Sequence, residues 1–176
     1  MRLIDRPSKA VHADLLLAQK LVYDPCGLVI QNLMPEKEST EYGAAEFEMN
    51  QLRIKFRVGK ITPTKTGQFV TFWKRIGKGP ILPYDLDDPF DLFVVSMRNA
   101  DHFGQFVFPK KVLCERGIVS KNEVGGKRAL RVYPPWDAVD NRQAKRTQAW
   151  QLEWFIEIPE KLNIAHARVE YLYRPT

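Results

Sequence analysis

The sequence predicts a mixed α/β fold (α+β): a curved, mainly antiparallel sheet flanked by helices, in a single domain over residues 1–176. Three observations predict it. Hydrophobic residues make up 44% of the chain, enough to fill one substantial core. Stretches with apolar residues at helical spacing lie towards both ends. Between them, short apolar or alternating segments are separated by turns rich in Gly and Pro, the pattern of neighbouring strands.

The first element is expected to be an amphipathic helix over residues 8–24, where apolar side chains recur at helical spacing. Pro25 and Gly27 supply the signals that end a helix. Residues 28–33 then read as a short apolar strand, and residues 35–40, with their Glu and Lys side chains, as an exposed loop.

A strand is expected over residues 52–60, because apolar and basic side chains alternate there. Its predicted core face consists of Leu52, Ile54, Phe56 and Val58, and its basic face of Arg53, Lys55 and Arg57.

Three more strands are expected over residues 68–74, 91–97 and 104–108, with a turn near Pro63 and a Gly- and Pro-rich loop over residues 77–83. The simplest arrangement of these four consecutive strands is an antiparallel meander.

The last third of the chain is expected to hold a strand over residues 128–133, which Pro134 and Pro135 end because proline cannot continue a ladder. A helix is expected over residues 140–155, because an Asp stands three residues before a Gln, as in a capping box. The core side of this helix is predicted at Ala149, Leu152 and Ile156, and residues 166–173 are read as a further strand.

Charge and composition narrow the class of protein. The formal net charge is +6 and the isoelectric point about 9.3, which favours a polyanionic partner. Cys26 and Cys114 lack the spacing of a zinc site or a disulfide framework and are expected to be buried as small apolar residues. Apolar runs fall far short of the roughly 18 to 20 residues of a membrane span, so the protein is expected in the cytoplasm.

Basic residues interleaved with aromatic rings and amides are the strongest functional signal. Lys and Arg neutralise phosphates, aromatic rings stack on bases, and Gln reaches base edges, so this mixture predicts a nucleic-acid-binding surface. The alternative for each Trp is a place in the core, where large rings usually lie. The candidate residues are Lys60, Lys65, Gln68, Trp73, Lys74, Arg75, Lys127, Arg131, Tyr133, Trp136, Gln143, Lys145, Gln148 and Trp150.

Catalytic and metal sites find less support in the sequence. Asp85, Asp87, Asp88 and Asp91 could suggest the magnesium site of a nuclease, but the Glu-x-Lys or Gln-x-Lys triplet of a restriction-type site does not follow them. Gln143-Ala144-Lys145 has the residues of such a triplet, but it lies in the expected helix and not on an adjoining strand. The aspartates are interpreted as turn-forming residues beside prolines. The glycines match neither a P-loop nor GxGxxG, and the three histidines have no recognisable nucleophile partner. We therefore expect no catalytic residue, metal or cofactor.

The order of several motifs resembles the MepB-like family over roughly residues 40–158. The motifs are Lys60-Ile61-Thr62-Pro63-Thr64-Lys65-Thr66-Gly67-Gln68-Phe69-Val70, Trp73-Lys74-Arg75, Gly79-Pro80-Ile81, Gly104-Gln105-Phe106-Val107-Phe108-Pro109-Lys110, Gly126-Lys127-Arg128, Arg131-Val132-Tyr133-Pro134-Pro135-Trp136 and Gln148-Ala149-Trp150-Gln151. The resemblance implies a bacterial protein of a family without an established catalytic activity. Residues 73–111 are also similar in style to DNA-reading domains of modification-dependent restriction systems, which hold an extruded base against pocket aromatics.

Together these features predict a non-catalytic nucleic-acid-binding protein, with DNA favoured over RNA. Two alternatives remain. A metal-dependent nuclease of restriction-endonuclease type would need the Asp85 to Asp91 carboxylates to converge beside a lysine. A small-ligand or protein-interaction module would use the aromatic pocket without a basic rim.

Overall fold

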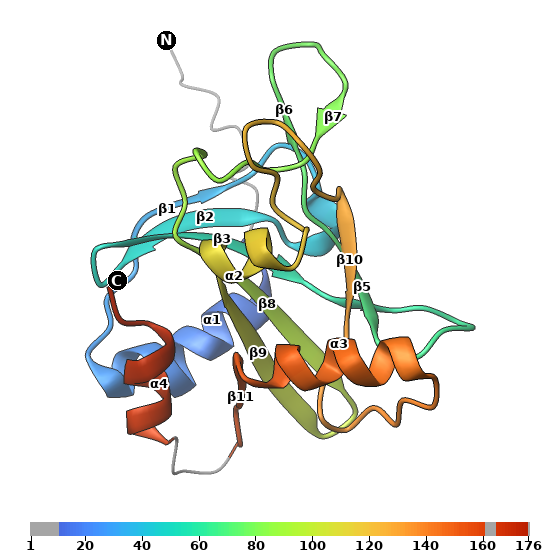
Figure 1. The fold of residues 1–176 in the computed structure, drawn as a ribbon. Helices are drawn as coiled ribbons and strands as arrows, with labels where there is room; N and C mark the ends of the chain where they lie inside the picture. Colours follow the sequence, from blue (N-terminus) through green and yellow to red (C-terminus); the bar gives the residue numbers. More distant parts are fainter. Residues whose placement is uncertain (1–10, 161–164, 176) are drawn as a thin grey trace, which may run out of the picture.

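A computed structural model describes residues 11–160 and 165–175 (Figure 1). The chain enters through a continuous helical segment made of α1 (Ala13–Ala18), the π-helix η1 (Gln19–Tyr23) and the 3₁₀ helix η2 (Asp24–Cys26). The side chain of His12 accepts the backbone N–H of Asp14 and caps its start, and Gly27 ends it with a φ of 70°. The predicted helix is confirmed over this range, and its expected start at Ser8 lies outside the described residues.

Six strands form the main sheet, in the spatial order β1-β2-β3-β8-β9-β11. They are β1 (Gln31–Pro35), β2 (Ala45–Met49), β3 (Leu52–Val58), β8 (Leu92–Asn99), β9 (His102–Pro109) and β11 (Phe155–Glu157). Four of the five pairings are antiparallel, and β3 with β8 is parallel. The mainly antiparallel α/β fold predicted from the sequence is confirmed.

The predicted four-strand meander is wrong, because the chain leaves the main sheet after β3. The strands β4 (Lys60–Ile61), β5 (Gln68–Thr71) and β10 (Ala129–Val132) form a second sheet in the order β10-β5-β4. The strands β6 (Lys74–Arg75) and β7 (Ile81–Leu82) form a separate hairpin. This excursion is the crossover that a parallel β3–β8 pairing requires.

Both faces of the main sheet are covered. One face packs against α1, η1 and α4 (His166–Leu172), which lie together in Figure 1. The other packs against β5, β10, α2 (Lys110–Glu115) and α3 (Arg142–Leu152). The central strand β8 is buried from Leu92 to Met97, which explains its unbroken apolar sequence. A short 3₁₀ helix, η3 (Thr40–Tyr42), precedes β2.

Several boundaries differ from those predicted. A helix, His166–Leu172, replaces the strand predicted over residues 166–173, because Val169, Leu172 and the C-cap Tyr173 have helical spacing and all enter the core. Strand β1 begins at Gln31, three residues later than expected, and Ile156 lies on β11 and not on α3.

The buried side of α3 also differs from the prediction. Ala144 and Gln151 are buried, whereas Ala149 is exposed.

Cys26 and Cys114 are free and half-buried, hence less buried than expected. No helix in residues 11–160 and 165–175 combines the length and apolarity of a membrane span.

Candidate nucleic-acid interface

A groove with a cavity volume of about 400 Å³ lies between β10 and α3. The segment before β5, the end of α2 and the start of β10 complete its walls. Its lining residues include Lys65, Phe69, Arg116, Lys127, Arg131, Tyr133, Asn141, Gln143, Thr147, Trp150 and Gln151.

The side chain of Gln151 attaches α3 to β10. It is 1% exposed, its Nε2 donates to the carbonyl of Arg131 at 3.0 Å, and its Oε1 accepts the backbone N–H of Tyr133 at 2.8 Å. The amide therefore pairs with the strand edge as a neighbouring strand would, and satisfies the Arg131 carbonyl and the Tyr133 N–H. This attachment sets the width of the groove.

The first turn of α3 lies at the mouth of the groove. The Oδ1 of Asn141 accepts the backbone N–H of Ala144 at 2.8 Å, so the N-cap is Asn141, one residue beyond the predicted Asp140. Asn141, Gln143 and Ala144 line the cavity. The positive end of the helix dipole and the polar first turn therefore border the groove.

The groove is strongly basic. Four of its lining residues, Lys65, Arg116, Lys127 and Arg131, are cations, and none of its described lining residues is a carboxylate. Arg131 is held in place because its Nη1 donates to the Oγ1 of Thr62 at 3.0 Å. Lys65, Lys127 and Arg116 are exposed. Positive charges on facing walls of the groove produce a positive potential that attracts anions.

Aromatic rings stand among these cations. The Trp150 ring is half-buried, with its centroid 5.4 Å from that of Phe108 and 5.2 Å from the guanidinium carbon of Arg116. Tyr133 lies so close to Gly67 that a Cβ there would come within 2.7 Å of its ring, and the φ of +81° at Gly67 also favours glycine. The Tyr133 ring therefore depends on this glycine for its position.

Six of the fourteen predicted site residues meet in this groove: Lys65, Lys127, Arg131, Tyr133, Gln143 and Trp150. Sequence reasoning missed Arg116, which reaches the groove through the position of α2, and no local motif marks it. It also missed Asn141 and Gln151. The nearest signal for Asn141 was the capping pattern at the start of the helix, and the nearest signal for Gln151 was the motif that contains Trp150.

Three further predicted residues, Trp73, Lys74 and Arg75, line a different hollow of about 410 Å³ beside β2 and β3. Carboxylates compensate the cations there: Lys74 pairs with Asp88 at 2.6 Å and Arg75 with Glu38 at 2.9 Å. This second hollow is therefore a weaker candidate for a polyanion than the groove.

Ion pairs also neutralise two of the three cations on the predicted basic face of β3, whereas Arg53 is exposed. Lys55 contacts Glu36 at 3.0 Å and Glu46 at 2.6 Å, and the 1%-exposed Arg57 pairs with Glu36. Burial alone would lower the pKa of Lys55, but the charge of Glu36 and hydrogen bonds to both carboxylates outweigh it and raise the pKa to about 12. Lys55 thus remains a cation and is a poor candidate for a general base.

Three predicted residues have internal partners outside the groove. Gln68 is 1% exposed, and its Nε2 donates to the carbonyl of Arg98 at 3.1 Å. Gln148 donates to the carbonyls of Pro134 and Asp137, at 2.9 and 3.1 Å, and so holds the loop after β10.

Trp136 is the third. It stacks on His102 with the ring centroids 4.9 Å apart and meets Phe155 edge-on, and its buried indole nitrogen has no hydrogen-bond partner among residues 11–160 and 165–175. The remaining two predicted residues, Lys60 and Lys145, are exposed outside the groove lining, with the Lys60 ammonium 4.8 Å from the centroid of the Tyr42 ring.

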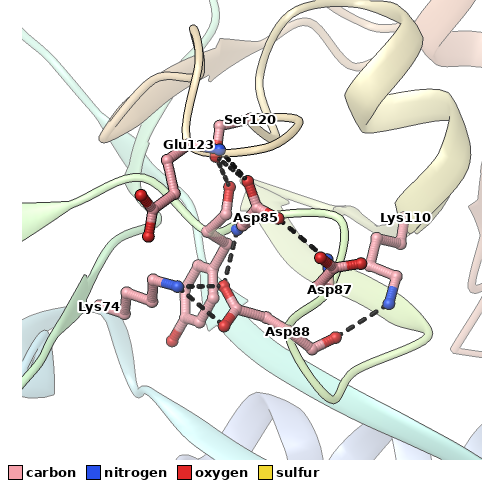
Figure 2. A network of polar contacts seen from close by, with 8 residues as sticks. Lys74, Asp85, Asp87, Asp88, Lys110, Ser120 and Glu123 are labelled. Atoms are coloured by element: carbon pink, nitrogen blue, oxygen red, sulfur yellow. Dashed lines mark hydrogen bonds and ion pairs between the residues drawn. The ribbon is translucent and has the colours of Figure 1, made fainter.

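The acidic cluster organises a loop. The Asp85 carboxylate accepts the Ser120 hydroxyl at 2.7 Å and the backbone N–H groups of Glu123 and Asp87, as Figure 2 shows. The Asp88 carboxylate accepts both Lys74 and the backbone N–H of Asp85. This agrees with turn-forming aspartates. In the described part of the chain, no group of three or more His, Cys, Asp or Glu residues could hold a metal ion.

The bonds to Asp85 predict an acid-sensitive loop. The hydrogen bond from Ser120, with those from the two backbone N–H groups, lowers the Asp85 pKa from its ordinary 3.8 to about 2. The stabilisation from the Asp85 charge is therefore complete above the unfolded-state pKa of 3.8 and is lost as pH falls through about 2. Asp85→Asn should weaken the pH dependence of the unfolding free energy in this window, measured by urea titration. The exposed Asp101→Asn is the control, and equal curves for the two variants would contradict the prediction.

Comparison with known proteins identifies the family. The MepB-like family model matches residues 36–157, so the chain belongs to the MepB-like family. The crystal structure of MepB has 31% sequence identity and a TM-score of 0.73, and the match covers 85% of this chain and 99% of that one. The bacterial homing endonuclease I-Ssp6803I matches with 15% identity and a TM-score of 0.40, over 78% of this chain and 88% of that one. This second likeness is too weak to support an inference about the chain. No curated protein sequence matches it.

Proposed function

We propose that the protein binds nucleic acid in the groove between β10 and α3, with DNA favoured over RNA, and holds it without cleaving it. The observation that carries the proposal is the set of four cations, Lys65, Arg116, Lys127 and Arg131, in a groove with no carboxylate among its described lining residues. Such a site attracts the phosphates of a polyanion and has no internal anion to compete with them.

The rest of the groove supplies the other contacts that nucleic-acid binding uses. Trp150 and Tyr133 offer rings for stacking, and Gln143 and Asn141 offer amides for hydrogen bonds. Beyond the lining, the exposed Arg142, Lys145 and Arg146 continue the basic surface along α3.

The first test is a salt titration of binding to duplex DNA, single-stranded DNA and RNA. About four phosphate contacts should give a log–log salt slope of roughly −3 to −4, from about −0.7 to −0.9 per neutralised phosphate. Absence of binding at about 50 mM salt would refute the proposal.

A pair of variants with equal charge change locates the site. Lys65→Ala/Lys127→Ala removes two groove cations and should reduce the magnitude of the salt slope by roughly 2 and weaken binding. The control Lys20→Ala/Arg53→Ala removes two exposed cations outside the groove and should leave the slope unchanged. Equal losses in both double variants would mean that binding is diffuse and the groove is not its site.

Cleavage is tested separately. The Asp85 and Asp88 carboxylates already accept hydrogen bonds from protein groups, so we expect nucleic acids to stay intact with Mg²⁺ or Mn²⁺. Cleavage that is lost in Asp88→Ala and retained in the exposed Asp101→Ala would show that the protein is a nuclease and would contradict the proposal of binding without cleavage.

A further inference from the structure

A third cavity, of about 340 Å³, lies at the opposite end of α2 from the groove. The starts of β3 and β8, the first turn of α2 and the end of α4 surround it, with Leu52, Leu92, Val112 and Leu172 among its lining residues. Its volume falls within the range of roughly 300 to 1,000 Å³ typical of small-molecule sites.

Two aromatic rings form one wall of this cavity. Trp154 and Tyr171 stack with their centroids 6.2 Å apart and their planes 17° apart. Trp154 is half-buried, and Tyr171 is 42% exposed. Flat apolar surface in an open concavity favours binding of a ligand with an apolar body.

Cations gather around the cavity. Lys110, Lys111 and Arg174 line it, and Asp91 is the only carboxylate among the described lining residues. The Oδ2 of Asp91 already accepts the backbone N–H of Arg53 at 2.8 Å. Lys110 donates to the carbonyl of Asp88 at 2.9 Å, whereas Lys111 is exposed and the Arg174 guanidinium lies 4.5 Å from the centroid of the Tyr171 ring.

We propose that this cavity binds a small amphiphilic anion, whose apolar body lies between Val112 and the Trp154–Tyr171 wall and whose carboxylate or sulfonate meets Lys111 and Arg174. An apolar interior with cations at its margin matches this ligand in both shape and charge. The chemistry differs from that of the groove, where polar and cationic side chains dominate, so the proposal stands whether or not the groove binds nucleic acid.

The test uses the full-length protein and two probes, the fluorescent anion 8-anilinonaphthalene-1-sulfonate and decanoate as its competitor. One saturable site for the dye is expected, and decanoate should displace the dye from it. Decanol, which lacks the negative charge, should displace the dye at least about tenfold less effectively. Val112→Trp should fill the cavity and abolish binding. Leu16→Trp, at an exposed apolar position on α1, is the matched control for bulk.

A charge reversal provides an independent variant that leaves the core unchanged. Lys111→Glu/Arg174→Glu should weaken dye binding by about tenfold or more, whereas Lys20→Glu, outside the cavity, should not. Unfolding midpoints of all variants identify any that are misfolded. Full binding by a folded Val112→Trp, or by the charge-reversal variant, would overturn the proposal. So would a wild-type dimer that Val112→Trp converts to a monomer, because a second copy would then occupy the cavity.

Discussion

Glu36→Gln is expected to lower the free energy of unfolding by about 3–5 kcal/mol, which would make it one of the most damaging single substitutions of a polar residue in this chain. Glu36 is the carboxylate that pairs with the buried Arg57 and also accepts Lys55 at 3.0 Å. Without its charge, a guanidinium that is 1% exposed loses its compensating anion in a low-dielectric site. Among the described residues, the buried Arg57 Nε has no hydrogen-bond partner, and the Phe56 carbonyl that accepts from Nη1 is uncharged and cannot replace the anion.

A nearby ion pair supplies the control for urea denaturation. Glu38 pairs with Arg75 at 2.9 Å, but the two side chains are 46% and 33% exposed, so Glu38→Gln should cost no more than about 1 kcal/mol. The double variant Glu36→Gln/Arg57→Met removes both buried partners and should recover a large part of the loss. Equal losses for Glu36→Gln and Glu38→Gln would show that the Arg57 charge is stabilised by other groups.

Local patterns predicted the class of fold because the hydrophobic periodicity of a helix or strand can be read from a few neighbouring residues. The alternation from Leu52 to Val58, the apolar run around Val94 and the helical spacing before Gly27 each yielded an element of the expected kind. Pairing between strands depends on contacts distant in sequence. Nothing within residues 52–97 reveals that β3 pairs in parallel with β8 or that β5 pairs with β10.

Glutamines illustrate why the site was only partly predictable. Gly67-Gln68 and Gly104-Gln105 open two similar segments, and both side chains are buried, with the Nε2 of each donating a hydrogen bond inside the protein. Gln143, in contrast, lines the groove. The sequence shows which groups a residue carries, while exposure of those groups depends on the tertiary packing around them.

The tryptophans show the same dependence. Trp136 follows Pro134 and Pro135, which end the predicted strand, so the sequence alone predicts a loop position with an accessible ring. Instead Trp136 packs on His102 and Phe155, while Trp150 lines the groove. The two residues should therefore differ in what their removal costs.

Trp136→Ala should lower the free energy of unfolding by roughly 3 kcal/mol or more and leave nucleic-acid affinity per folded molecule unchanged. The loss comes from the cavity left beside His102 and Phe155. It is reduced slightly because the substitution also removes a buried indole N–H that has no hydrogen-bond partner in the described part of the chain.

Trp150→Ala should weaken nucleic-acid binding by about 1–3 kcal/mol, the range for loss of one base–aromatic stack, in addition to a loss of stability through its contact with Phe108. Trp154→Ala is the matched control, because Trp154 is also half-buried but does not line the groove, so its removal should lower stability without changing nucleic-acid affinity per folded molecule. A denaturant melt and a DNA titration on the three variants separate the two effects. If Trp150→Ala bound as tightly as Trp154→Ala per folded molecule, the Trp150 ring would contribute to the core only, and phosphate contacts would have to supply the affinity of the groove.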